Sequence, residues 1–351
     1  MRLIFLMFIA AYVTAVGLVQ AQTFPVLKGV VRDSVTGLPV ENVNVFLSST
    51  TLGVGTDRAG RYMLRNVPPG HYSLICSRVG YALKAVSVDV GHIDTVISNV
   101  TLAPRLIMMG AVEVSSEAAR EFQKNLERFT GVFLGDGPNA PQCRITNPQV
   151  LNFLFDDQSG ILIAGADQPL LITNTALGYD LQVSMAEFRW DTHLDFGAYV
   201  IYPQFRSLPV AGERDSLERN ANRARTYDGS FQHFLRALVT GNMESERFVV
   251  YKGDLEELQQ GRGAYVPPDA LQLEFQPGSW LKLWVFDGWL RVSRLGEGTY
   301  RASYITMDRS GALIDHFGVL DNPLAVQIIG RWSRERVADM LPLNEGQPSS
   351  P

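Results

Sequence analysis

Residues 27–102 alternate between apolar and polar positions with a period of two, the pattern of half-buried β-strands. One run is centred on Val45, with Asn42 and Asn44 among its polar positions. Similar runs occur at Tyr72, Leu74 and Cys76 and at Val86, Val88 and Val90. Segments rich in Gly and Pro separate these runs. They predict turns, because Gly tolerates positive φ and Pro fixes φ at a value that suits a turn. The pattern predicts about six or seven short strands packed as a small β-sandwich.

The pattern changes after residue 102. Residues 103–116 predict a connector, and residues 117–128 predict a helix because Ala118, Phe122 and Leu126 recur every four positions. Further strands are expected at 151–155, 161–164, 170–173, 181–185, 199–202, 248–251, 271–275, 281–286, 290–293 and 300–307. We therefore predict a mainly β protein, in which the sandwich precedes a mixed α+β body.

Three helices are predicted in this body. Residues 213–227 form a charged helix, and a second begins after the cap Ser230 and ends at Gly241. An apolar stripe on the second consists of Phe231, Phe234, Leu235 and Leu238. The stripe predicts inward packing, with His233 and Arg236 directed toward the flank or solvent. A terminal helix is expected at 334–340, capped by Ser333 and stopped by Pro342.

The run GTDRAGRYMLRNVPPGHYSL at residues 55–74 is the most specific motif. With GVVRDSVTGLPVENVNVFL before it and SRVGY after it, the stretch from Gly29 to Tyr81 resembles the carboxypeptidase regulatory-like domain, a transthyretin-like or prealbumin-like β-sandwich. The resemblance implies an accessory domain, assigned to residues 24–103, without catalytic residues. Peptidase activity does not follow from the family name.

The remainder of the chain resembles bacterial secreted proteins that carry such a domain, through FLGDGPNAPQCRITNPQVLNF and GRWSRERVADMLPL. This resemblance implies an envelope location and no reaction. We expect a linker and helix at residues 104–130, an α+β body at 131–344 and a polar tail at 345–351.

The N-terminus predicts export. Arg2 precedes an apolar run at residues 3–19, and Val19-Gln20-Ala21 offers a cleavage site, so residues 1–21 fit a signal peptide. Retention as a membrane anchor is the alternative, because the run approaches the length of a bilayer span. No membrane span is expected in the mature chain, which would lie in the periplasm, at the outer membrane or at the cell surface.

Composition argues against a largely disordered protein and against a nucleic-acid-binding protein. The chain is 46% hydrophobic and 19% charged, as in ordinary globular proteins, so long disorder is not expected. Its net charge of −5 at pH 7 provides no basic stripe for nucleic acid. The two cysteines, Cys76 and Cys143, could form a disulfide between sandwich and body or remain buried thiols.

Motifs for catalysis are not found. The five histidines are scattered, and no metal-ligand spacing, nucleophile elbow or phosphate loop is present, so we expect no metal, no cofactor and no recognisable catalytic residue. Asp156 and Asp157 could pair as carboxylates, but a hairpin turn before Gly160 explains them more simply.

Two clusters are candidate ligand-binding residues. The first contains Arg219, Arg223, Arg225, Tyr227, His233 and Arg236, which could meet an anion unless neighbouring acids neutralise them. The second contains Trp280 and Trp284 on one face of a strand, where they could stack on sugar rings or be buried in a core. The sequence thus favours a non-catalytic module that binds an envelope protein or glycan. A glycan-binding protein, or a peptidase or glycosidase with a dispersed site, is the alternative.

Overall fold

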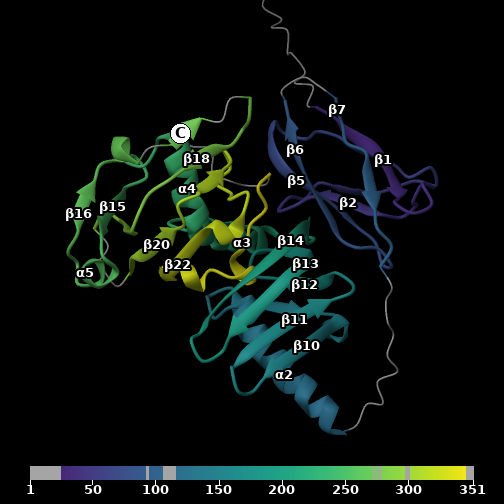
Figure 1. The fold of residues 1–351 in the computed structure, drawn as a ribbon, viewed down its shortest axis with the longest axis horizontal. Coiled ribbons are helices and arrows are strands. Elements are labelled where there is room, and N and C mark those ends of the chain that lie inside the picture. The colour runs from purple at the N-terminus through teal and green to yellow at the C-terminus, as the bar shows by residue number, and fades with distance from the viewer. Residues whose placement is uncertain are drawn as a thin grey trace, which may run out of the picture.

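The computed structural model describes residues 25–91, 95–105, 116–271, 273–275, 278–296 and 301–344. The expected signal peptide, the polar tail and most of the connector lie outside these residues. Figure 1 shows a sandwich, a central sheet and a C-terminal unit of smaller sheets. The protein is mostly β, which confirms the predicted fold class.

The N-terminal sandwich consists of two four-stranded sheets. Its strands are β1 (Leu27–Asp33), β2 (Asn44–Leu47), β3 (Gly53–Gly55), β4 (Arg61–Leu64), β5 (Gly70–Ser77), β6 (Lys84–Val90), β7 (Val96–Ile97) and β8 (Val100–Leu102). One sheet has the order β3-β2-β5-β6, and the other places β1 between β4 and β7, with β8 also paired to β1. Apolar residues at alternate positions, such as Val45 and Leu74, fill the space between the sheets. The period of two matches the burial along β4 and β8, whereas β2 and β5 are buried on both faces, with Phe46 and Ile75 fully buried outside the sandwich core.

The central sheet follows the connector. Its elements are α2 (Ser116–Leu134), β9 (Cys143–Ile145), β10 (Leu151–Asp156), β11 (Ile161–Ala166), β12 (Leu170–Asn174), β13 (Tyr179–Asp191) and β14 (Phe196–Ser207). The order is β10-β11-β13-β12-β9, and β14 pairs along β13 with a bulge after Met185. Helix α2 covers one face, where Phe129 and Phe133 pack against Phe188. Because this packing continues past Arg128, α2 is longer than the sequence pattern predicted.

The C-terminal unit has a core of its own. After α3 (Glu213–Tyr227) come α4 (Phe231–Thr240), β15 (Phe248–Gly253), α5 (Leu255–Gln259), β16 (Ala264–Val266), β17 (Leu273–Phe275), β18 (Lys282–Trp284), β19 (Trp289–Arg294), β20 (Ser303–Met307), β21 (Ala312–Ile314) and β22 (Val326–Gly330). The sheets are β16-β15-β19-β20-β22 and β17-β18-β21. Helix α4 starts and ends as predicted: the Ser230 side chain accepts from the His233 N–H, and Gly241 is left-handed. Its stripe, including Phe234, packs into this core.

One expectation is wrong, and one open alternative is decided. In place of a terminal helix at 334–340, the chain forms two 3-10 turns, η6 (Arg331–Arg334) and η7 (Val337–Asp339). The Ser333 hydroxyl donates to the Gly330 carbonyl and caps nothing. The disulfide between Cys76 and Cys143 is absent, because both thiols are free and each is buried in a different core. Burial raises the pKa of each to about 12, so both remain protonated thiols.

The sandwich docks on the outer edge of the central sheet, at β14. The Ser49 N–H donates to the Pro203 carbonyl at 2.7 Å, and the Phe205 N–H donates to the Thr50 carbonyl at 2.9 Å. The Asn44 side chain adds a hydrogen bond to the side chain of Gln204 at 2.9 Å. Residues 203–205 of this edge are therefore closed by another part of the same chain.

Candidate functional site

The hairpin of β10 and β11 presents an apolar surface at the opposite edge of the central sheet. In the described chain β10 pairs with β11 alone, so its outer side is an open strand edge. Leu154 is directly opposite Ile163, which is opposite Arg189 on β13. Since Phe153 packs on α2 and side chains alternate along a strand, this row lies on the face away from the helix.

Two apolar side chains in this row are exposed to solvent: Leu154 is 71% exposed and Ile163 is 39% exposed. Beside them is an open groove of about 270 Å³, lined by Leu154, Phe155, Asp156, Ser159, Ile161, Ile163 and Arg189. Adjacent exposed apolar residues at an unpaired edge are typical of a surface that another molecule covers. We refer to Leu154, Ile163, Arg189 and this groove as the β10 surface.

The two charged side chains of the β10 surface, Asp156 and Arg189, have different surroundings. Asp156 closes the hairpin by accepting from the Ser159 hydroxyl at 2.6 Å and the Gln158 N–H at 3.0 Å. These hydrogen bonds lower the pKa of Asp156, and the bond from the Ser159 hydroxyl has the largest effect. The Asp156 carboxylate therefore remains an anion. The expected hairpin turn is thus confirmed, and the carboxylate is part of that turn. Arg189, by contrast, is exposed beside the groove.

Sequence reasoning placed strands at both segments and assigned no site to them. A signal was present, because consecutive apolar residues at 153–155 and 161–164 put apolar side chains on both faces of a strand. One face is covered by α2, and the other is exposed. Only the packing of α2 distinguishes the buried face from the exposed one, and only the pairing order places β10 at an edge.

The arginines of the predicted basic cluster have partners within the protein. Arg219 forms an ion pair with Asp215 at 2.8 Å. Arg223 donates to the Leu177 carbonyl at 2.8 Å and lies 4.2 Å from the ring centre of Tyr179. Arg225 donates to Asn222. Arg223 thus attaches α3 to the central sheet, whereas Arg219 and Arg225 are paired within α3.

The histidine of that cluster is buried, which contradicts its predicted position at the flank or in solvent. His233 is 6% exposed, and its ring lies 4.7 Å from that of Tyr227. The Gly229 N–H donates to Nδ1 at 3.0 Å, so the ring proton is on Nε2, which donates to Glu246 at 3.0 Å. Burial lowers the pKa of His233, while Glu246 opposes this effect. Arg236, the last member, is partly buried and its backbone lies against Gly318.

The two tryptophans do not form an exposed pair. Trp284 is 0% exposed and packs against Phe234 in the C-terminal core. Trp280 precedes β18 and lies 5.4 Å from His316. A sugar-stacking platform built from these two rings is therefore excluded by the burial of Trp284.

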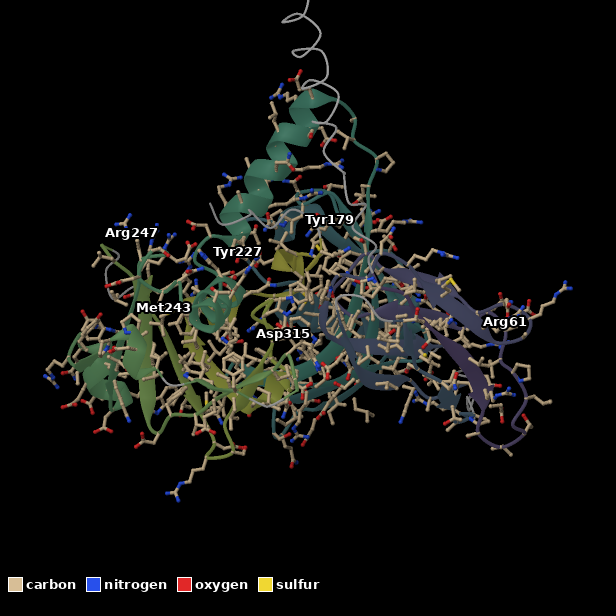
Figure 2. The ribbon with its side chains drawn as sticks, turned by 90° about the horizontal axis from the view of Figure 1, so that it is seen from above. Arg61, Tyr179, Tyr227, Met243, Arg247 and Asp315 are labelled. Carbon is tan, nitrogen blue, oxygen red and sulfur yellow. The ribbon has the colours of Figure 1, made fainter. Side chains whose placement is uncertain are left out.

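A buried polar seam joins the sandwich to the C-terminal unit. His71 on β5 lies between Asp89 of the sandwich, at 2.7 Å, and Asp321, at 3.3 Å. Nearby, Asp315 accepts from the N–H groups of Phe317 and Val319, and Figure 2 shows it in the middle of the molecule. Burial raises the pKa of Asp315 to about 7 despite these bonds. Tyr72 contacts Phe317 at this seam, so it is a joint between the two units, and Asp89 and Asp321 are exposed at its rim.

The described residues contain neither a cluster of metal ligands nor a helix that could span a membrane. No three side chains among their His, Cys, Asp and Glu residues gather as metal ligands. None of the helices described is both long enough and apolar enough to cross a bilayer.

Comparisons with known proteins bear on the N-terminal domain. No curated protein matches the chain significantly. Similar solved structures include a cohesin–X-dockerin complex from Acetivibrio cellulolyticus, 14% identical, which covers 29% of this chain and 73% of its own with a TM-score of 0.22. A candidate carbohydrate-binding protein from Bacteroides uniformis is 10% identical, with coverages of 53% and 80% and a TM-score of 0.20. A DUF3823 family protein from Bacteroides ovatus is 9% identical, with coverages of 53% and 82% and a TM-score of 0.19.

Such low TM-scores carry no argument about the fold of the whole chain or its function. The match to a family model is more informative, because it coincides with a folded unit. Residues 26–103 match the model of the carboxypeptidase regulatory-like domain and span the eight strands of the sandwich. The N-terminal sandwich of this chain is a carboxypeptidase regulatory-like domain.

Proposed function

We propose that the chain is an exported, non-catalytic protein of the bacterial envelope that binds an extended segment of a partner protein along β10. The observation that carries this proposal is the open strand edge with Leu154 and Ile163 exposed beside it. Export is supported by the signal-like N-terminus and by the secreted proteins that the body resembles.

An extended strand of a partner protein fits both the open edge of β10 and the exposed apolar side chains beside it. The outer side of an edge strand offers N–H and C=O groups to another strand, and the exposed side chains give a pocket for alternate residues. The opposite edge strand of the same sheet already takes part in main-chain hydrogen bonds of this kind, because the turn at Ser49 and Thr50 hydrogen-bonds to β14. Arg189 at the groove favours a partner segment that carries an acidic residue.

A hydrolase is less well supported. A catalytic pocket requires convergent acidic or histidine side chains with access to water. In the groove the one carboxylate is that of Asp156, and its hydrogen bonds hold the hairpin turn. His233 and Asp315 are titratable but buried among packed side chains.

Site-specific photocrosslinking in the native envelope tests the proposal. A photoreactive residue at Leu154 should give a discrete adduct with a partner protein, whereas the same residue at Leu217, exposed on α3, should not. Burying a leucine side chain contributes about 1.5–3 kcal/mol, so Leu154→Asp should weaken binding of the purified partner at least about tenfold. Leu217→Asp, the matched control, should bind normally. Equal affinity of Leu154→Asp and wild type for the purified partner would refute the proposal. A photocrosslinked adduct at position 154 that contains a glycan and no protein would also refute it.

A further inference from the structure

The C-terminal unit carries a row of aromatic residues around one arginine, far from the β10 surface. In the five-stranded sheet, Tyr265 on β16 lies opposite Tyr251 on β15, which lies opposite Arg291 on β19, which lies opposite Tyr304 on β20. Leu290 and Val292, the neighbours of Arg291 in the sequence, point to the other face, into the larger core. On the Arg291 face, Leu258 of α5 packs in a small cluster with Tyr304, Tyr251 and Trp289. Figure 1 shows β15, β16 and α5 on the side of the molecule away from the sandwich.

Arg291 is buried with almost no partner. It is 7% exposed, and its guanidinium lies 4.3 Å from the ring centre of Tyr251. Among the residues that the structure describes, its Nε has no hydrogen-bond partner, and its Nη1 reaches the Leu258 carbonyl alone, at 3.5 Å. Within the described residues no carboxylate pairs with this cation.

A buried cation without a counter-ion is costly, and nearby aromatic rings compensate only in part. A guanidinium presents a planar fork of donors that fits a carboxylate through two parallel hydrogen bonds. The missing partner is therefore best supplied from outside the protein. Its chemistry is that of a carboxylate.

The surroundings of Arg291 favour a ligand that carries a ring with an apolar face. Tyr265 is 54% exposed, and its ring lies 5.9 Å from that of Tyr251. Trp289 is half-buried and lies two residues before Arg291 in β19, hence on the same face. Exposed aromatic faces beside a cation provide both stacking and charge recognition.

We propose that Arg291 and the aromatic residues Tyr251, Tyr265 and Trp289 bind the carboxylate-bearing sugar of an acidic glycan. The carboxylate is held by the guanidinium of Arg291, and the sugar ring lies against the exposed face of Tyr265. This site is on a different sheet from the β10 surface, so each can fail in experiment without the other.

Calorimetric titration of the purified protein tests this site. The probes are a galacturonic acid trisaccharide and a glucuronic acid-containing oligosaccharide, and the control is the methyl ester of the first, which lacks the charge. We expect the acids to bind and the ester to bind at least about tenfold more weakly, since a charged hydrogen-bonded pair contributes about 1.5–3 kcal/mol.

Two variants separate recognition from stability. Arg291→Lys keeps the charge but loses the fork, and should weaken binding of the acid. Tyr265→Ala removes a largely exposed ring, so the fold should persist while affinity falls several-fold. Phe275→Ala, at a 75% exposed ring on β17, is the matched control and should bind normally.

Several results would overturn the proposal: no binding of either acid at millimolar concentration, equal binding of acid and ester, or full affinity in Tyr265→Ala. In each case Arg291 would serve only to contact the end of α5 through the Leu258 carbonyl. If Arg291→Lys does not fold, the ester and Tyr265→Ala still decide the question.

Discussion

Two edge strands of the central sheet, β14 and β10, are treated in opposite ways by the same chain. At β14 the sandwich supplies main-chain partners through Ser49 and Thr50, and Phe205 there is buried. At β10 the outer side is open, and Leu154 is exposed beside it. A strand edge left open is a liability unless something covers it. The contrast therefore separates an edge that stabilises the fold from an edge that is available to a partner.

The closed edge depends on unusual local backbone. Ser49 has φ of 59°, in the left-handed region, which directs its N–H to Pro203 and its carbonyl to Leu343. Thr50 is fully buried, and its hydroxyl donates to the Leu47 carbonyl at 2.8 Å. The loop after β2 is thus shaped to fit this edge, and nothing comparable lies at β10 in the described residues.

The largest expected difference between the edges is in side-chain burial. Phe205→Ala should lower the free energy of unfolding by about 3–5 kcal/mol, because its buried ring packs on Tyr179 and leaves a cavity. Leu154→Ala should lower it by less than about 0.5 kcal/mol. Urea unfolding of both variants measures the difference. Similar losses would mean that β10 is packed as tightly as β14.

A pH-dependent effect is expected at the seam between the sandwich and the C-terminal unit. The pKa of Asp315 is about 7 in the folded protein and near 3.8 when unfolded. Between about pH 4 and pH 7 the Asp315 carboxyl is protonated in the folded protein and ionised in the unfolded chain. The contribution of Asp315 to the free energy of unfolding therefore falls as pH rises from about 4 to 7. A full shift of this size corresponds to a few kcal/mol, at roughly 1.4 kcal/mol per pH unit.

A neighbouring group opposes this trend. Burial lowers the pKa of His316 to about 4, so its contribution to stability rises between about pH 4 and 6.5. The comparison of wild type with Asp315→Asn isolates the carboxyl, because the amide oxygen can still accept from Phe317 and Val319. The stability of wild type relative to this variant should decline from pH 4 to 7. A difference that stays flat, or increases, would contradict the shifted pKa.

The closed edge can also be broken through its backbone. Ser49→Pro removes the N–H donated to Pro203 and demands negative φ, so we expect a loss of about 3 kcal/mol or more in unfolding free energy. Ser49→Gly retains the N–H and suits the left-handed conformation, so it should be as stable as wild type. Chemical denaturation of the pair tests this. If proline were tolerated, the docking of the sandwich on β14 would be unimportant for stability.

Features with local causes were predictable from the sequence. The bounds of α3 and both caps of α4 follow from residues within or next to those helices. The terminal helix fails for a non-local reason. Glu335 turns inward to accept from the Phe231 N–H of α4 at 3.0 Å, and Asp339 accepts from Asn139 at 2.8 Å. These tertiary hydrogen bonds outweigh a short helical preference.

The candidate site was less predictable, for the same reason. His233 lies beside the apolar stripe of α4, and only the fold reveals that Tyr227 and Glu246 cover it. The strands at residues 151–155 and 161–164 were predicted, but pairing order is a property of the assembled sheet. Sequence periodicity indicates which residues share a face, and it does not indicate which strand ends up outermost.

The smallest effect on stability, and the sharpest test of the open edge, is expected for Leu154→Lys. An exposed lysine on an edge strand discourages pairing with other chains, while little packing is lost at a largely exposed position. Unfolding free energy should change by less than about 0.5 kcal/mol. Self-association at high protein concentration, measured by sedimentation velocity, should decrease relative to wild type, whereas Leu217→Lys on α3 should not reduce it. A marked loss of stability would instead show that Leu154 is packed in solution, and the two edges of the sheet would then be alike.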